Sequence, residues 1–344
     1  MKKFIAIICM LVLCLSLCAC GKTEPEESKP GESISESIPE SEPEESKTEK
    51  KTLALCMSAI EHPLHRLAQY GFIKTAEELG YNAKICGLKS APIQELLAEW
   101  GTLLNDRDIQ GVAIWTGDDS CYDLLKEFSA KEIHTVVPYY VHGYEYSHEF
   151  IEYNPATDEF GIGTDAARFV IEALKERGIT EGTIGMSQIG AGGTDNARND
   201  KFREIIANTD FTMLNGIIEG PEITESTSKA TKYINDNPDM VAAVSLTGNL
   251  KTWTTAKANT GRDDLIVLNY AYGQPIEDFT TDGFMIDPFY EAGVEAAKAL
   301  AALNEGKTYT EAEWQSYLPV NTVDREGYAE YEARYNEAQE YFAK

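Results

Sequence analysis

From about residue 52 onward, short apolar runs alternate with longer segments in which apolar residues recur every three or four positions. Such short runs are typical of strands buried on both faces, and the longer spacing is typical of helices. The alternation predicts an α/β fold with parallel sheets. The predicted strands are residues 53–57, 83–88, 111–115, 135–139, 183–187, 241–246, 265–269 and 283–286.

The segment between the first two strands predicts a helix and therefore a βαβ unit. Pro63 stands where a first helical residue is favoured, and Gly80 stands where the helix would end. The remaining helices are predicted at residues 90–104, 121–130, 158–177, 197–208, 226–235, 250–259, 288–305 and 325–342.

The first residues of the chain have a different pattern. Lys2 and Lys3 precede an apolar run, residues 4–17, which is too short for a stable membrane span and indicates a signal peptide. The run ends in Leu-Cys-Ala-Cys-Gly, whose second cysteine is Cys20. This junction resembles the bacterial lipobox. The resemblance implies a lipoprotein signal peptide over residues 1–20, lipid on Cys20, and an extracytoplasmic protein anchored to the outer face of the cell membrane.

The next segment, residues 21–51, consists almost entirely of Glu, Ser, Pro, Lys and Thr. This composition cannot bury enough apolar surface to offset the entropy of the chain. We therefore predict a disordered linker that tethers the folded part to the membrane.

The charge of the chain argues against a nucleic-acid partner. The formal net charge is −27, and removal of the signal peptide leaves 28 basic and 57 acidic residues, or −29. Such a surface repels phosphate groups and anionic lipid.

Three cysteines fall in the predicted folded part, and an odd number gives no complete disulfide framework. Cys56 and Cys86 lie on what are predicted to be neighbouring strands. Buried free thiols are the favoured interpretation, and a Cys56–Cys86 bridge stays open as the alternative.

Several sequence segments together resemble the type I periplasmic binding proteins of the ribose-binding family. The first βαβ unit, from Leu53 through Ser58, His62 and His65 to Gly80, has the spacing with which that family opens. The resemblance continues to the C-terminal part of the chain, through Asn196-Ala197-Arg198 with Phe202, Asn237-Pro238-Asp239, and residues 287–307.

This resemblance implies two Rossmann-like parallel-sheet lobes that are joined by a three-crossing hinge and bind a ligand between them. It places residues 52–153 and 288–318 in the N-terminal lobe. The C-terminal lobe would then hold residues 154–287 and 319–344.

Three residues match family positions that reach the ligand. Ser58 would contact ligand, or would only cap the following helix. Arg198 would offer its planar fork of donors to ligand oxygens, or would form a surface salt bridge. Asp287 stands where the family has a sugar-binding glutamine, or it would only order the hinge.

Other positions depart from the ribose pattern. His62 replaces an asparagine, and Leu64 and His65 replace two stacking aromatic residues. The pair Tyr139-Tyr140 replaces Asp-Arg. His62 and His65 have no third metal ligand at suitable spacing, so we predict polar contacts and no metal.

Gly248 beside Asn249 stands near a family asparagine, so the grip on pentose is not reproduced. For the tryptophans, we favour the ligand site for Trp115 and the core for Trp253.

We predict a monomeric solute-binding protein that captures a small polar ligand, a sugar or sugar derivative, and delivers it to an ABC permease. No cofactor and no catalysis are expected, because the sequence contains neither a Gly-x-Ser-x-Gly nor a His-Glu-x-x-His motif. The alternative is a sensory receptor of the same fold that signals to a membrane histidine kinase or chemoreceptor. A nucleoside or another small polar ligand also stays open.

Overall fold

The computed structural model describes residues 51–344 except 190–194, 221, 248–250, 274 and 279. The described residues lie within one compact unit, Glu49–Lys344. Cys20, the signal peptide and nearly all of the predicted linker lie outside the described residues, as do Gly248 and Asn249.

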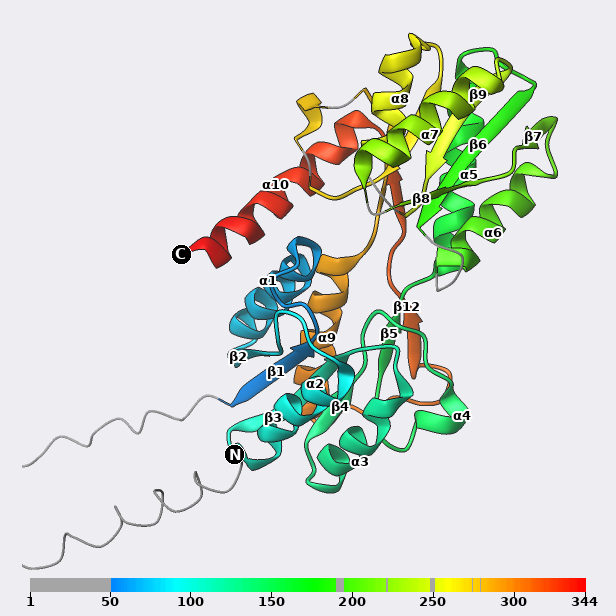
Figure 1. The fold of residues 1–344 in the computed structure, drawn as a ribbon. Coiled ribbons are helices and arrows are strands. Elements are labelled where there is room, and N and C mark those ends of the chain that lie inside the picture. Colours follow the sequence, from blue (N-terminus) through cyan, green and yellow to red (C-terminus); the bar gives the residue numbers. More distant parts are fainter. Residues whose placement is uncertain (1–50, 190–194, 221, 248–250, 274, 279) are drawn as a thin grey trace, which may run out of the picture. The chain divides into compact units, whose positions relative to one another are not determined.

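Lobe 1, as we name it, is the part built on the first sheet (Figure 1). This sheet is parallel and has the strand order β2-β1-β3-β4. Its strands are β1 (Thr52–Met57), β2 (Asn82–Cys86), β3 (Ile109–Trp115) and β4 (His134–Val136). Its helices are α1 (Pro63–Glu78), α2 (Ile93–Gly101), α3 (Tyr122–Ala130), α4 (Tyr144–Ser147) and α9 (Phe289–Asn304). A small parallel pair, β5 (Asn154–Ala156) and β12 (Gln315–Tyr317), completes it.

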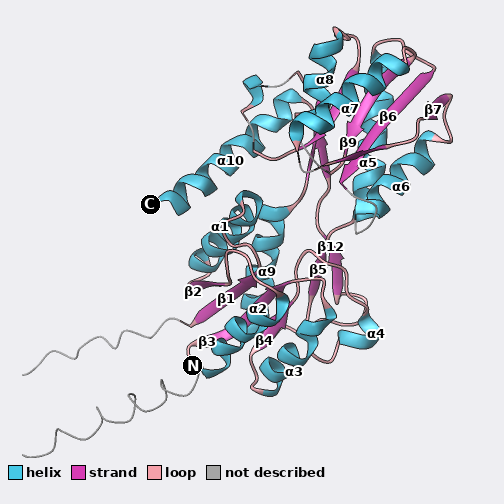
Figure 2. Cartoon of the chain, in the orientation of Figure 1, coloured by secondary structure: helices cyan, strands magenta, loops and turns pink. Residues whose placement is uncertain are grey.

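Lobe 2 is the part built on the second sheet (Figure 2). The strand order of this sheet is β13-β11-β10-β9-β6-β7, with β8 also paired to β6. Only β13 runs antiparallel to its neighbour. The strands are β6 (Gly182–Ile189), β7 (Phe211–Met213), β8 (Ile217–Glu219), β9 (Met240–Ser245), β10 (Ile266–Tyr270), β11 (Gly283–Ile286) and β13 (Asn321–Val323). The helices are α5 (Glu159–Glu176), α6 (Asp195–Ile206), α7 (Ile223–Asp236), α8 (Thr252–Thr260) and α10 (Arg325–Ala343).

The predicted α/β class with parallel sheets is confirmed, and each predicted apolar run overlaps a strand of the structure. The chain passes between the two sheets three times, after β5, after β11 and after β12. The pattern missed β5, β7, β8, β12 and β13, which have three residues each. Strands this short contain too few positions to show a periodicity. The exact lobe boundaries given above stay a proposal.

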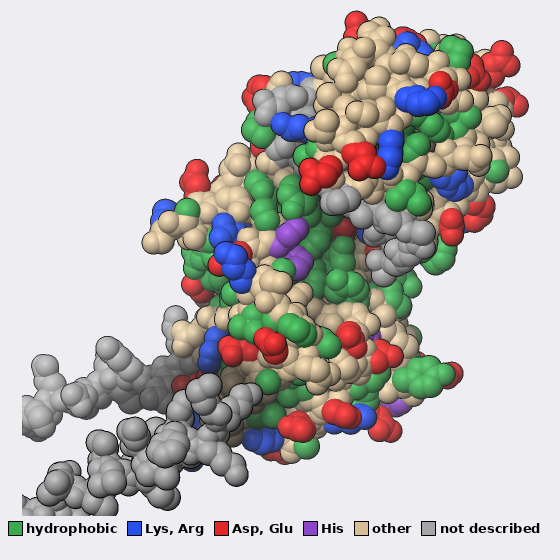
Figure 3. Space-filling model, viewed as in Figure 1, with side chains coloured by type: hydrophobic (Ala, Val, Ile, Leu, Met, Phe, Trp, Pro, Cys, Tyr) green, Lys and Arg blue, Asp and Glu red, His purple; other side chains and the backbone are tan. Residues whose placement is uncertain are grey.

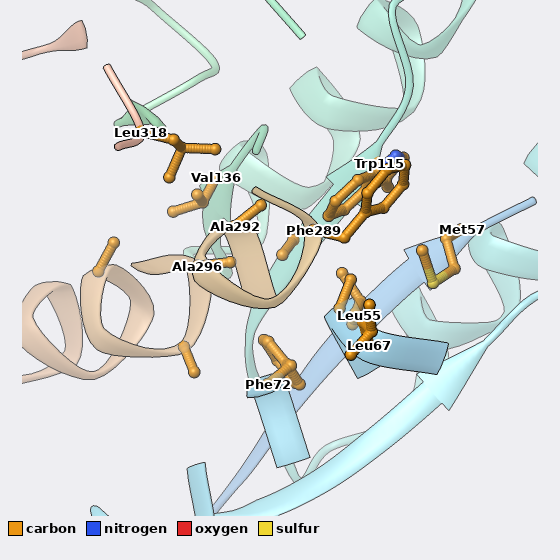
Figure 4. Packing of buried hydrophobic residues seen from close by; sticks show 14 of the residues in the cluster. Leu55, Met57, Leu67, Phe72, Trp115, Val136, Phe289, Ala292, Ala296 and Leu318 are labelled. Atoms are coloured by element: carbon orange, nitrogen blue, oxygen red, sulfur yellow. The ribbon is translucent and has the colours of Figure 1, made fainter. Parts of the chain in front are cut away.

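The closest helix packing in lobe 1 is between α1 and α9. A Cβ atom at Gly293 of α9 would lie 2.0 Å from the backbone oxygen of Ala68, and one at Gly71 of α1 would lie 2.6 Å from that of Tyr290. The two glycines therefore allow the helix backbones to touch. Buried apolar side chains fill the space between these helices and the first sheet, among them Leu55 and Phe72 (Figure 4).

The C-terminal helix α10 contacts both lobes. In lobe 2, the ring of Tyr328 stacks on Phe284 of β11 at 3.9 Å. In lobe 1, Gln339 donates a hydrogen bond to the backbone oxygen of Pro63 at 3.0 Å and accepts one from Arg66 at 3.3 Å. Figure 1 shows α10 beside α1. Helix α10 therefore links the two lobes through contacts with β11 and α1.

Two further findings concern the cysteines and the membrane. Cys56, Cys86 and Cys121 are buried and free, so the structure does not contain the Cys56–Cys86 bridge. Within the described ranges, no helix has the length and apolar character needed to cross a bilayer.

We expect Gly293→Ala to destabilise the protein by about 1–3 kcal/mol, because the added methyl group would overlap the α1 backbone and force the helices apart. Urea unfolding of the full-length protein, followed by circular dichroism, measures this change. Gly101→Ala is the matched control, since its Cβ would meet only Leu124 at 3.8 Å. A helical alanine there should be neutral or stabilise by up to about 1 kcal/mol. Equal effects of the two substitutions would contradict the proposed close packing.

Candidate functional site

The carboxyl ends of several strands and the first turns of several helices converge between the two sheets. Trp115 is the last residue of β3, Tyr139 follows β4, and Asp287 follows β11. Phe289 and Glu159 are the first residues of α9 and α5, and Arg198 lies in the first turn of α6. We call these six residues the central cluster. In open parallel sheets this is the edge where ligands bind.

A buried ion cluster holds the polar half of the central cluster together. The side chain of Arg198 is only 2 % exposed. Its Nε donates to Glu159 Oε2 at 2.6 Å and its Nη2 to Oε1 at 3.0 Å. Both Nη atoms also contact Asp287 Oδ2, at 3.3 and 3.4 Å. Arg198 is therefore no surface salt bridge, and its charge is balanced by two carboxylates from separate segments.

Two phenols complete the surroundings of Asp287. Tyr139 donates its hydroxyl to Asp287 Oδ2 at 2.9 Å, and Tyr270 does so at 3.1 Å. Burial first, and the nearby Asp287 carboxylate second, raise the pKa of both phenols. Burial lowers the pKa of Arg198, but Asp287 and Glu159 outweigh it, and the net result is a raised pKa. The phenols stay donors and the guanidinium stays charged at every ordinary pH.

Stacked aromatic rings form the other half of the central cluster. The ring of Trp115 lies 4.8 Å from that of Tyr139 and 5.6 Å from that of Phe289, nearly parallel to both. Figure 4 shows Phe289 and Trp115 side by side. The rings of Tyr139 and Phe289 are 5.0 Å apart. These contacts place flat apolar faces next to a buried ion cluster.

The backbone of Tyr139 is strained. Its φ of +77° lies in the left-handed region, which a bulky L-residue rarely adopts and which costs about 1–3 kcal/mol. Two short backbone hydrogen bonds hold this conformation, from Tyr139 to Pro155 and from Thr157 to Tyr139, both at 2.7 Å. Strain of this kind persists where the surroundings fix a residue in place, as they do here for the ring and the hydroxyl.

The first turn of α1 brings two histidines close to these rings. The His65 ring lies 5.9 Å from Phe289, and its Nδ1 donates to the backbone oxygen of Ser58 at 2.8 Å. His62 Nε2 is 2.7 Å from the hydroxyl of Tyr272, a contact between the lobes. Burial lowers the pKa of both histidines. Figure 3 shows histidine side chains beside a hollow with hydrophobic walls.

The remaining predicted residues have different positions. Ser58 does not cap α1, because His62 occupies the N-cap position and no side chain caps the helix. Leu64 is buried in the lobe 1 core, and its predicted place at the ligand stays a prediction. The ring of Tyr140 lies 5.1 Å from Tyr139, at the margin of the central cluster. Trp253 is fully buried in a lobe 2 core, as predicted.

Sequence reasoning missed Glu159 and Phe289. Both are first residues of helices that follow hinge crossings. Glu159 directly follows Asp158, where a helix was predicted to begin, and Phe289 directly follows the Asp287-Pro288 pair. The sequence signal that could have found them is their place at a predicted helix start, directly after a crossing, at the edge of the sheets where ligands bind. In the part of the chain that the structure describes, no group of three or more His, Cys, Asp or Glu could hold a metal ion.

Several buried polar atoms in the central cluster and at the start of α1 have no hydrogen-bond partner among the described residues. They are Trp115 Nε1, His62 Nδ1 and Asp287 Oδ1. Buried polar atoms are nearly always paired in folded proteins, and leaving one unpaired costs about 1–3 kcal/mol. Atoms of this kind are suited to contact with a polar ligand.

A cavity of about 290 Å³ lies beside Asp287 on the side of α10. Its polar lining includes Glu291, Glu330 and Arg334. Arg334 pairs with both glutamates at 2.9 Å. The cavity thus adds two carboxylates and one guanidinium to the surroundings of Asp287.

No family model matches the chain, and no curated protein matches it. Solved structures do. An arabinose binding protein from Geobacillus stearothermophilus matches with a TM-score of 0.68 at 14 % identity, covering 82 % of this chain and 99 % of its own. The chain has the fold of the type I periplasmic binding proteins.

Two further structures share this fold. A glucose-galactose binding protein from Geobacillus stearothermophilus has a TM-score of 0.62 and 16 % identity, and the match covers 81 % of this chain and 98 % of the other. An ABC transporter solute binding protein from Bradyrhizobium sp. BTAi1, with bound Bis-Tris, has a TM-score of 0.72 and 12 % identity, with 84 % and 86 % covered.

We expect the stability of the protein to fall as the pH is lowered from 7 towards 5.5, in part through His65. Because burial lowers the pKa of folded His65, the unfolded chain takes up the proton first, so acid favours unfolding below the ordinary histidine pKa of about 6.5. His65→Gln keeps a donor for Ser58 and cannot titrate, so it should show a smaller pH-dependent loss. Denaturant midpoints at each pH measure this difference.

His148→Gln is the control, because His148 is exposed. A loss of stability between pH 7 and 5.5 that is equally large in the wild type and in His65→Gln would contradict the assignment to His65.

Proposed function

We propose that this protein is a solute-binding protein that captures a sugar or sugar derivative between its two lobes at the central cluster. The observation that carries the proposal is the junction of a buried ion cluster with stacked aromatic rings where both lobes meet. Hydrogen-bonding groups suit the hydroxyls of a sugar, and aromatic faces suit its C–H surface.

Details of the site support binding more than catalysis. The charged groups Arg198, Glu159 and Asp287 are paired with one another and largely buried, so this cluster presents no exposed nucleophile or general base. The unpartnered Trp115 Nε1 and Asp287 Oδ1 offer one donor and one acceptor. A ligand that satisfies both would bind without any change in covalent structure.

The structures of similar fold support the choice of ligand class. Their names describe binding of arabinose and of glucose and galactose, and a further one, from Actinobacillus succinogenes 130z, has bound D-allose. We extend sugar binding to this chain as a proposal, because identities of 12–16 % establish the fold and not the ligand.

We further propose that the protein acts outside the cytoplasm, anchored by lipid on Cys20, and delivers its ligand to an ABC importer. The lipobox-like junction and the acidic, Pro- and Ser-rich segment after it support the anchor. A ligand that bridges the lobes would shift the equilibrium towards a closed form that a permease can recognise.

The test is thermal unfolding of the full-length protein, in mild detergent, against about a hundred sugars, sugar acids, nucleosides and amino acids. A ligand at roughly 1,000 times its Kd adds about 4 kcal/mol of stability, which raises the midpoint by several degrees. We expect a shift with one class of sugars. An unchanged midpoint with every sugar, or a shift only with nucleosides or amino acids, would contradict sugar capture.

Arg198→Lys tests whether binding depends on the central cluster. Lysine cannot reproduce the fork of donors that positions Glu159 and Asp287, so we expect at least a tenfold loss of affinity for the sugar found in the screen. Arg177→Lys is the matched control, because Arg177 pairs with Asp282 away from the cluster. Isothermal titration gives both affinities, and equal values would place the site elsewhere.

A further inference from the structure

The donors of Arg198 are fully engaged within the protein. A guanidinium has five N–H groups. Five contacts use them: two to Glu159, two to Asp287 Oδ2, and one from Nη1 to the backbone oxygen of Leu246 at 3.2 Å. A carboxylate or phosphate on a ligand could bind Arg198 only by displacing one of these acceptors. Arg198 therefore organises the site and does not offer a free positive charge.

The balance of charge at the central cluster is negative. Two carboxylates, Glu159 and Asp287, surround one guanidinium, which leaves a formal charge of −1. Among described residues, Arg198 is the only cation bonded to Asp287. The adjoining cavity adds Glu291 and Glu330 against Arg334, a further −1. An anionic group beside Asp287 would meet repulsion that water screens poorly, because Asp287 is only 5 % exposed.

The unpaired Oδ1 of Asp287 indicates a ligand group that donates a hydrogen bond or carries a positive charge. Oδ1 is buried and has no hydrogen-bond partner among the described residues, whereas Oδ2 accepts from Arg198, Tyr139 and Tyr270. A carboxylate oxygen only accepts hydrogen bonds, so a hydroxyl or an ammonium group would satisfy it. The stacked rings of Trp115 and Phe289 lie next to Tyr139, and aromatic rings in general attract positive charge at their faces and are compatible with neutral C–H groups.

We propose that the site selects neutral or cationic polyhydroxylated ligands over their anionic counterparts, and that Asp287 is the residue that sets this specificity. The proposal rests on the sugar-binding function given above and deepens it. It assigns sugar acids to the excluded class. Glu159 contributes by holding Arg198 so that its charge is already neutralised.

The experiment compares matched probes by isothermal titration with the full-length protein at pH 7 and 0.15 M salt. The probes are glucose, galactose and mannose, each with its 2-amino derivative and its uronate. For each parent that binds, the tighter of the hexose and the hexosamine should bind at least tenfold more tightly than the uronate. Asp287→Asn should reduce this discrimination at least threefold, since it removes the repulsion and keeps the shape of the side chain.

Asp123→Asn is the control, because it removes one negative charge from a side chain that is 94 % exposed on α3. It should leave the discrimination unchanged within twofold. Glu159→Gln provides a second variant with one carboxylate fewer in the cluster, in case Asp287→Asn does not fold. It should also reduce discrimination at least threefold.

Three results would contradict these proposals, and each contradicts a different part of them. A uronate that binds within tenfold of its best counterpart would overturn the specificity proposal and leave sugar binding intact. Discrimination that survives in every folded cluster variant would overturn the role of Asp287. If none of the nine compounds binds but the thermal screen finds another sugar, the same comparison is made with that sugar, its amino derivative and its acid. If neither experiment finds a sugar that binds, sugar capture itself is contradicted, and the specificity that rests on it falls as well.

Discussion

The structure depends on one buried charge, the guanidinium of Arg198. Removal of such a group from water costs several kcal/mol, and only partners with good geometry compensate for it. Here Glu159 comes from the start of α5, and Asp287 from the crossing between β11 and α9. Because these segments are far apart in sequence, the need to neutralise Arg198 fixes α5, α6 and the crossing relative to one another. Loss of Arg198 would leave the buried carboxylates of Glu159 and Asp287 without their cation.

At and beside the central cluster, two hydrogen bonds between described residues link lobe 1 to the hinge crossing and to lobe 2. Tyr139 reaches Asp287 from lobe 1, and His62 pairs with Tyr272 of lobe 2. Each such bond contributes about 1 kcal/mol net, so opening of the lobes at this place costs little, and a ligand that bridges them can readily favour the closed form. The strained backbone of Tyr139 also supports a binding site here, because residues in rare conformations concentrate at sites that bind ligands or change conformation.

Apolar packing limits how the lobes can move. The core between α1, α9 and the first sheet continues through Tyr331 and Ala338 of α10 to Phe284 of β11. A motion about the three crossings must therefore carry α10 along or slide it over α1. The interlobe hydrogen bonds and this continuous core act at different places. The interlobe hydrogen bonds cost little free energy to break. The apolar core resists separation, because separation would expose its apolar surface to water.

The sequence determined the longer elements, because these strands and helices follow from local periodicity and Pro63 marks a helix start by its fixed φ. It also indicated Arg198 and Asp287, whose spacing matches a family pattern. Tertiary structure alone decided that they pair with each other and with Glu159, that Phe289 stacks on Trp115, and that Leu64 belongs to the core. These contacts join residues from separate strands and helices, and local periodicity has no information about which ends of the sheets come together.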